Sequence, residues 1–180
     1  DRPGPVVVAL DGSPQSYGGL MTAFELGKVF GRPVEAVAVF DPHFHYTAFN
    51  SIANVLSAEA AKVFRFEEQE KLHEEIIDSG LAKIYQGHLD VAAKLARERG
   101  VELKTTLLAG KSFEQLLDHL HEAKPWLMVL GRIGVHSEAG MDMGSATENL
   151  LRLGNCNLLI SSRCFEPPIE HIAEATMAWT

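Results

Sequence analysis

Short apolar runs recur along the chain, and each ends in residues that favour a turn. The five runs are PVVVALDGS (5–13), PVEAVAVFDP (33–42), VELKTTLLAG (101–110), PWLMVLG (125–131) and NLLISS (157–162). Runs of this length, rich in Val, Ile and Leu, predict buried strands. Since strands that are apolar on both sides are typical of parallel sheets, the pattern predicts an α/β fold: an open five-stranded parallel sheet with helices on both faces.

Helical patterns lie between these runs. Residues 15–30 read as a helix, and SFEQLLDHLHEA (112–123) places its apolar side chains on one face. Ser13 is predicted to cap the first of these helices, with Pro14 at its first position.

The segment LLAGKSF resembles only the end of a phosphate-binding P-loop. The P-loop motif also requires a glycine five positions before Gly110, and that position is Thr105. Gly110 is therefore predicted to form a strand-to-helix turn, with Ser112 as the helix cap.

The connection between the second and third predicted strands is longer than a crossover needs. An aromatic stretch, HFHYTAFNSI (43–52), precedes a long helical pattern, in which Ser79-Gly80 is expected to separate two helices. Residues 43–79 form an extended insertion. Two interpretations stay open for this segment: an extended crossover helix that packs on the domain or on a partner subunit, or a lid over a ligand.

Charge and cysteine usage limit the classes of partner and the compartment. The net charge of −8 argues against a nucleic-acid partner, and no run approaches the about eighteen apolar residues that a membrane span needs. Cys156 and Cys164 are separated by an extended segment of roughly 26 Å, too far for a disulfide. We therefore expect a reducing, cytoplasmic location and no membrane partner. No arrangement of His, Cys or carboxylate residues indicates a metal site.

Glycines gather after the fourth predicted strand, in LGRIGVHSEAGMDMGSATENLL (130–151). Gly131 ends the strand, and Gly144-Ser145 opens the next helix. Ser145 and Glu148 match a capping box, so Ser145 has a purely structural interpretation. The capping box does not explain the long glycine loop before it. A strand, a glycine loop and a helix N-terminus in succession can bind phosphate without a lysine.

The spacing Gly131-x2-Gly134-x9-Gly144-Ser145 resembles the nucleotide motif of the universal stress protein family, G-x2-G-x9-G-(S/T). VVVALDGSPQS is similar to that family's first strand and turn, and ATENLLRLGNCNLLISSR to its last helix and strand. The resemblance covers residues 1–163 except 43–79, and it implies the strand order 3-2-1-4-5. In this order strands one and four are neighbours at the switch point where open α/β sheets bind ligands.

The resemblance also implies which residues contact an adenine nucleotide. Leu10, Asp11 and Val39 would contact adenine. Gly131 and Gly134 would lie beside the ribose and α-phosphate, and Gly144 and Ser145 would receive the outer phosphates. The complete set of expected nucleotide-binding residues is Leu10, Asp11, Val39, Leu130, Gly131, Arg132, Gly134, Gly144, Ser145 and Ala146.

The resemblance implies a module that binds an adenine nucleotide (ATP, or AMP or ADP) and acts in stress response or regulation, with Mg²⁺ carried by the phosphates. The sequence shows no base or nucleophile positioned for catalysis. We therefore predict no catalytic residue and expect at most weak ATP hydrolysis. Two alternatives are a dimerisation scaffold of the same family that has lost nucleotide, and an adenylating enzyme of a related fold. The loop departs from a strong triphosphate site, because Arg132 is its one cation and Glu138 and Asp142 are acidic.

The resemblance and the pattern of the last strand predict a homodimer. NLLISS would be an edge strand, and it lacks the charges that protect exposed edges. Leu159 or Ser161 is expected to face the partner. The alternative is that the tail folds back and covers this edge within one chain. Residues 164–180, which contain Pro167-Pro168, are interpreted as a linker that leads to a further, C-terminal module.

Overall fold

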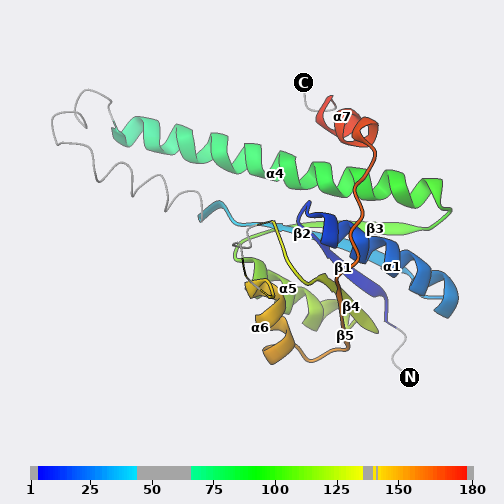
Figure 1. The fold of residues 1–180 in the computed structure, drawn as a ribbon. Helices are drawn as coiled ribbons and strands as arrows, with labels where there is room; N and C mark the ends of the chain where they lie inside the picture. The colour runs from blue at the N-terminus through cyan, green and yellow to red at the C-terminus, as the bar shows by residue number, and fades with distance from the viewer. Residues whose placement is uncertain (1–3, 44–65, 136–139, 141, 178–180) are drawn as a thin grey trace.

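Five parallel strands form a single sheet in the order β3-β2-β1-β4-β5 (Figure 1). The computed structural model describes residues 4–43, 66–135, 140 and 142–177. The strands are β1 (Val6–Leu10), β2 (Val34–Phe40), β3 (Leu103–Ala109), β4 (Leu127–Gly131) and β5 (Leu158–Ser161). The predicted fold class and the strand order implied by the resemblance are both confirmed.

Helices cover both faces of this sheet. Helices α1 and α4 pack on one face and α5 and α6 on the other, while α7 lies on the outer side of α4 (Figure 1). Their bounds are α1 (Pro14–Phe30), α4 (Phe66–Glu98), α5 (Ser112–Ala123), α6 (Ser145–Leu153) and α7 (Ile169–Met177).

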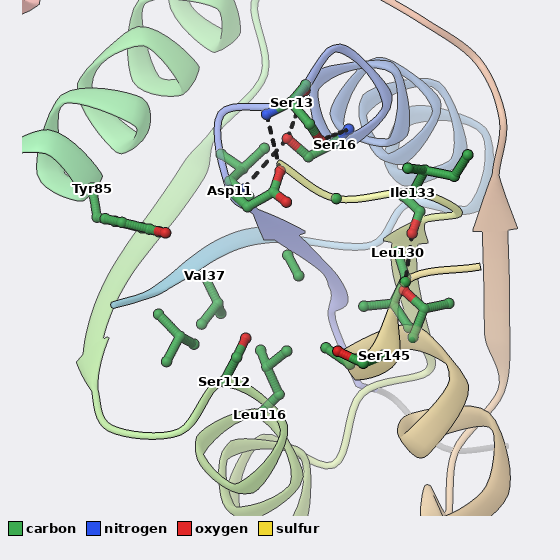
Figure 2. Close-up of a pocket in the computed structure, with 18 of the residues that line it drawn as sticks. Asp11, Ser13, Ser16, Val37, Tyr85, Ser112, Leu116, Leu130, Ile133 and Ser145 are labelled. Atoms are coloured by element: carbon green, nitrogen blue, oxygen red, sulfur yellow. Dashed lines mark hydrogen bonds between the residues drawn. The ribbon is translucent and has the colours of Figure 1, made fainter. Parts of the chain in front are cut away.

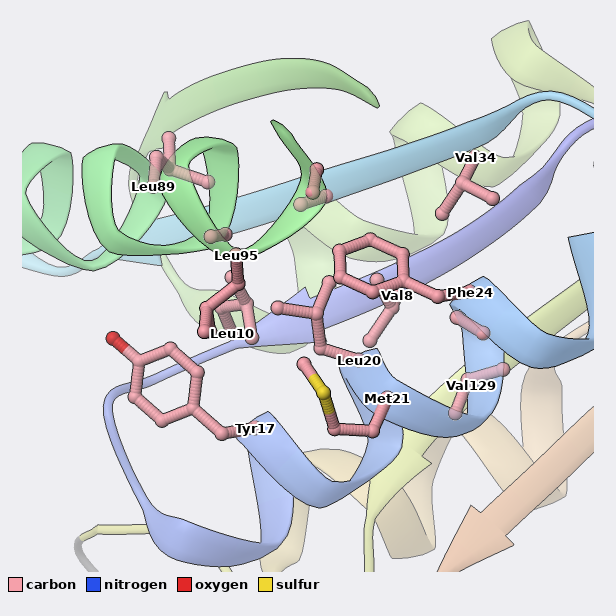
Figure 3. Packing of buried hydrophobic residues seen from close by; sticks show 14 of the residues in the cluster. Val8, Leu10, Tyr17, Leu20, Met21, Phe24, Val34, Leu89, Leu95 and Val129 are labelled. Atoms are coloured by element: carbon pink, nitrogen blue, oxygen red, sulfur yellow. The ribbon is translucent and has the colours of Figure 1, made fainter. Parts of the chain in front are cut away.

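The two sides of each central strand supply two separate cores. Val6, Val8 and Leu10 of β1 belong to the cluster under α1 and α4, whereas Val7 belongs to the cluster under α5. Successive side chains of a strand point to opposite faces, so a run of apolar residues serves both cores. Figure 3 shows the first cluster, to which α1 contributes Leu20 and Phe24 and α4 contributes Leu89 and Leu95. Each fully buried side chain of this kind contributes about 1.5–3 kcal/mol.

Two predicted helix caps have different outcomes. Ser13 is the N-cap of α1: its Oγ accepts a hydrogen bond from the N–H of Ser16 at 3.2 Å, and Pro14 is the first helical residue. The cap predicted at Ser112 is wrong, because Lys111 is the N-cap of α5 and makes no side-chain capping bond. Lys111 keeps extended backbone angles, so Ser112 is already the first residue inside the helix.

Helix α4 is continuous through Ser79-Gly80, so the predicted break is wrong. A glycine inside a helix costs only about 1 kcal/mol relative to alanine. The C-terminal half of α4 packs on β2 and β3 and buries Leu89 and Leu95, which outweighs that cost.

With 33 residues the helix is roughly 50 Å long, and its start extends past the sheet (Figure 1). The crossover interpretation thus describes α4, and the lid hypothesis concerns residues 44–52, outside the described residues.

The tail after β5 returns across the domain. The N–H of Phe165 donates to the carbonyl of Pro14 at 2.9 Å, and an ion pair joins Glu174 of α7 to Lys94 of α4. Part of the segment interpreted as a linker is therefore a packed helix, and the boundary after Arg163 stays a prediction. In the part of the chain that the structure describes, no helix is long and apolar enough to cross a membrane.

The outward-facing backbone of β5 differs from the prediction. The carbonyl of Ser161 accepts a hydrogen bond from the N–H of Arg132 at 2.9 Å, so Ser161 faces β4. Asn157 also faces β4, because its carbonyl accepts from the N–H of Met128 at 2.9 Å. Since backbone groups alternate along a strand, Leu159 faces β4 as well and Ile160 faces the free edge. The expectation that Leu159 or Ser161 faces a partner is wrong.

Candidate functional site

A cleft of about 340 Å³ lies at the carboxyl ends of β1, β2 and β4 (Figure 2). Strands β1 and β4 are neighbours, and the chain leaves them toward opposite edges of the sheet. This is the switch point at which open α/β sheets bind ligands.

Nine of the ten residues expected to bind nucleotide line this one cleft. They are Leu10, Asp11, Val39, Leu130, Gly131, Gly134, Gly144, Ser145 and Ala146. Arg132 is not part of the lining. Its Nε donates to the carbonyl of Asp142 at 2.7 Å, so its side chain holds the glycine loop together.

Side chains from the β1–α1 turn fix the position of the glycine loop. Asp11 Oδ1 accepts from the N–H of Ser13 at 2.9 Å, and its Oδ2 accepts from the N–H of Val135 at 2.8 Å. Gln15 Oε1 accepts from the N–H of Ile133 at 2.8 Å. A hydrogen bond to a charged group contributes about 1.5–3 kcal/mol. The Asp11 carboxylate therefore has a structural role, because it ties the loop to the start of α1.

Two glycines of the loop permit this close approach. A Cβ at Gly134 would lie 2.6 Å from Asp11 Oδ2, and a Cβ at Gly131 would lie 3.1 Å from the backbone nitrogen of Ser16. Any side chain at position 134 would displace the carboxylate. A side chain at position 134 thus requires Asp11 to move, and one at position 131 would be tight against the start of α1, whether or not a ligand lies beside them.

Helix α6 begins at the cleft with an open N-terminus. Gly144 is its N-cap and makes no side-chain capping bond, and the capping box considered for Ser145 is wrong, since Ser145 is already the first helical residue. The N–H of Gly144 donates to the carbonyl of Arg132 at 2.8 Å. The first N–H groups of a helix have no partner within the helix, so those of Ser145, Ala146 and Thr147 can bind an anion.

The β4 side of the cleft also contains a residue that was not predicted from the sequence. Thr147 Oγ1 donates to the carbonyl of Gly131 at 2.9 Å and joins the start of α6 to the end of β4. The two partners of this bond are 16 positions apart in the chain, so no local motif marked it.

The β2 side of the cleft is mostly apolar apart from Asp41, which follows β2, and most of this side was not predicted from the sequence. Val37 of β2 and Leu116 of α5 line the cleft together with Leu81 and Tyr85 of α4 (Figure 2). Leu81 and Tyr85 are four residues apart and so lie on the same face of the helix. Helical periodicity indicated that α4 has an apolar face, but gave no signal that this face reaches the cleft.

Two carboxylates give the cleft a negative character. Asp11 and Asp41 line it, and the described lining contains no Lys or Arg. Burial raises the pKa of Tyr85, and both carboxylates raise it further. Burial lowers the pKa of the neighbouring His88, against the opposing effect of Asp11. Near neutral pH the Tyr85 hydroxyl is therefore protonated and His88 is uncharged.

The fold and the cleft together define a class of protein: an open α/β domain whose glycine loop and helix N-terminus border a cleft at the switch point. The model of the universal stress protein family matches residues 4–162. The chain belongs to the universal stress protein family. No curated protein matches it.

Solved structures share this fold at low sequence identity. Universal stress protein UspA from Lactobacillus plantarum is 18% identical with a TM-score of 0.58, over 89% of this chain and 99% of that one. A universal stress protein in complex with cAMP is 18% identical with a TM-score of 0.59, over 89% and 97%. The universal stress protein from Archaeoglobus fulgidus in complex with dAMP is 17% identical with a TM-score of 0.54, over 88% and 98%.

Proposed function

We propose that the protein binds an adenine nucleotide in this cleft and acts as a stress-response or regulatory module with little or no catalytic turnover. One observation carries the proposal: a single cleft joins an apolar wall on the β2 side to an open helix N-terminus on the β4 side. A nucleotide has the matching polarity, with a flat base at one end and phosphate at the other. Related structures with cAMP and dAMP support the same ligand class.

The proposed roles follow the geometry of the cleft. The base lies against Leu10 and Val39 near Asp11, and the ribose and first phosphate lie beside Gly131 and Gly134. The outer phosphates meet the N–H groups of α6, at Gly144, Ser145 and Ala146, next to Leu130. Because the described lining contains two carboxylates and no cation, ATP is expected to bind better with Mg²⁺ on its phosphates than without it. Among the described residues no cluster of three His, Cys, Asp or Glu side chains could hold a metal by itself.

The purified protein is expected to release an adenine nucleotide on denaturation, or to bind one on titration. Chromatography of the released material and calorimetry with AMP, ADP and ATP, each with and without Mg²⁺, identify the ligand. No nucleotide in either measurement would favour the scaffold without ligand. ATP–pyrophosphate exchange would instead indicate an adenylating enzyme.

We also propose a cytoplasmic location, which the free thiols of Cys156 and Cys164 support.

We further propose a homodimer formed along the free edge of β5. The strand lies at the end of the sheet, and Leu151 and Leu153 of α6, the helix that precedes it in the chain, are 52% and 61% exposed. Pairing with a second copy would satisfy the outward backbone groups, and two-fold dimers are the commonest assemblies.

Ile160→Pro is expected to turn this dimer into a folded monomer, because it removes an outward N–H without touching the bonds to β4. Light scattering measures the mass, and circular dichroism checks the fold. Val29→Ala, at an exposed position of α1, is the control and should remain dimeric. A wild-type protein that is monomeric at high concentration would disprove the dimer.

A further inference from the structure

We propose that Tyr85, on α4, is the aromatic wall against which the base of the bound nucleotide stacks, and so a residue that determines base recognition. This inference rests on the proposed function and adds a contact from a helix that none of the motif residues occupy. The glycine motif accounts for the phosphate end of the cleft, and Tyr85 accounts for the base end.

The position of Tyr85 carries the first step. In Figure 2 its side chain extends from α4 into the space beside Val37, on the side opposite Ser145 and Leu130. Leu81, one helical turn earlier, lines the same cleft. The cleft thus has an aromatic surface at one end, at Tyr85, and a set of N–H donors at the other, at the start of α6. A nucleotide likewise has its base at one end and its phosphates at the other.

Neighbouring rings hold Tyr85 in this orientation before any ligand binds. Its ring centroid lies 6.4 Å from that of Phe40 and 5.4 Å from that of His88, at interplanar angles of 42° and 72°. Neither ring stacks parallel to Tyr85. His88 in turn packs on Gly12, where a Cβ would come within 2.5 Å of its ring. A side chain held in this way loses little conformational entropy when a base stacks on it.

The Tyr85 hydroxyl adds a polar group at the base end. No hydrogen bond joins this hydroxyl to another described residue, and it stays protonated near neutral pH. It can therefore donate to an acceptor on the base, while the ring supplies the stacking surface. Substitutions that keep or remove the ring separate these two contributions.

Binding of AMP and of ribose 5-phosphate, which lacks the base, to wild-type and variant protein tests the inference. Base–aromatic stacking predicts that Tyr85→Ala weakens AMP binding roughly 5- to 150-fold. Binding of ribose 5-phosphate should stay unchanged. Tyr85→Phe keeps the ring and loses one neutral hydrogen bond, so it should weaken AMP binding by about 2- to 10-fold and less than Tyr85→Ala does. Ile84→Ala, an exposed neighbour on the same helix, is the control and should bind like wild type. Tyr85→Trp adds a direct readout, because AMP should quench its fluorescence and ribose 5-phosphate should not.

The outcomes separate this inference from the proposed function. A wild-type protein that binds no adenine nucleotide overturns the proposed function and Tyr85 with it. AMP binding that is equal in wild type and Tyr85→Ala overturns the role of Tyr85 alone. Equal losses for AMP and ribose 5-phosphate also overturn it, since the side chain would then support the cleft rather than the base. If Tyr85→Ala does not fold, a Tyr85→Trp protein that binds AMP without quenching overturns the role of Tyr85 instead.

Discussion

Gly18→Ala is expected to destabilise the protein by about 2 kcal/mol or more, whereas Gly80→Ala should stabilise it by up to about 1 kcal/mol. Both glycines lie inside helices, so alanine gains the same intrinsic helix propensity at each position. A methyl group at position 18 would overlap the backbone carbonyl of Arg163, where the tail crosses α1. At position 80 nothing lies within 4 Å.

The two changes in stability have opposite signs because only the methyl group at position 18 overpacks its surroundings. Overpacking costs typically about 1–3 kcal/mol, and more where backbone must move. Thermal unfolding measures both variants, and a fall of about 4–8 °C is expected for Gly18→Ala. Limited proteolysis after Arg163 supplies a second readout, because the tail must shift to make room for the methyl group. Equal melting temperatures for the two variants would show that the tail does not lie on α1 in solution.

Gly134→Ala is expected to weaken adenine-nucleotide binding by at least about tenfold. The new Cβ would lie 2.6 Å from Asp11 Oδ2, the atom that accepts from the N–H of Val135. The carboxylate must then move, and the loop loses a charge-assisted bond of about 1.5–3 kcal/mol. A loop that is no longer fixed also loses the geometry that places a phosphate at the start of α6. Calorimetry with AMP and ATP measures the loss of affinity.

A double-mutant cycle isolates the cause of that loss. On an Asp11→Ala background the carboxylate is absent, so adding Gly134→Ala should cost little further stability or affinity. Val135→Ala is the matched control, because Val135 contacts Asp11 through its backbone N–H and its side chain is 52% exposed. If the losses from Gly134→Ala and Asp11→Ala simply add, the carboxylate is not the group that the methyl displaces.

The sequence by itself determined the sheet, the helices beside it and the glycine loop of the cleft. Apolar runs identified the strands because a strand buried on both faces must be apolar at nearly every position. Ser13 and Pro14 marked the start of α1 because capping is local chemistry. The spacing of Gly131, Gly134 and Gly144 resembles a family motif, and that resemblance predicted nine residues that line one cleft. These features depend on residues close together in the chain, or on a motif that others share.

Only the tertiary structure decided how distant segments meet. Asp11 and Val135 meet although they are 124 positions apart. Tyr85 lines the same cleft from α4, and the periodicity of that helix does not show which of its sides faces the cleft. Burial of Leu89 and Leu95 on the sheet keeps α4 continuous through Ser79-Gly80, against the local preference of those two residues. The overlap that forbids a side chain at Gly18 likewise exists only because the tail returns across α1. Contacts of this kind depend on the length of crossovers, the phase of helices and the path of the tail, none of which local chemistry specifies.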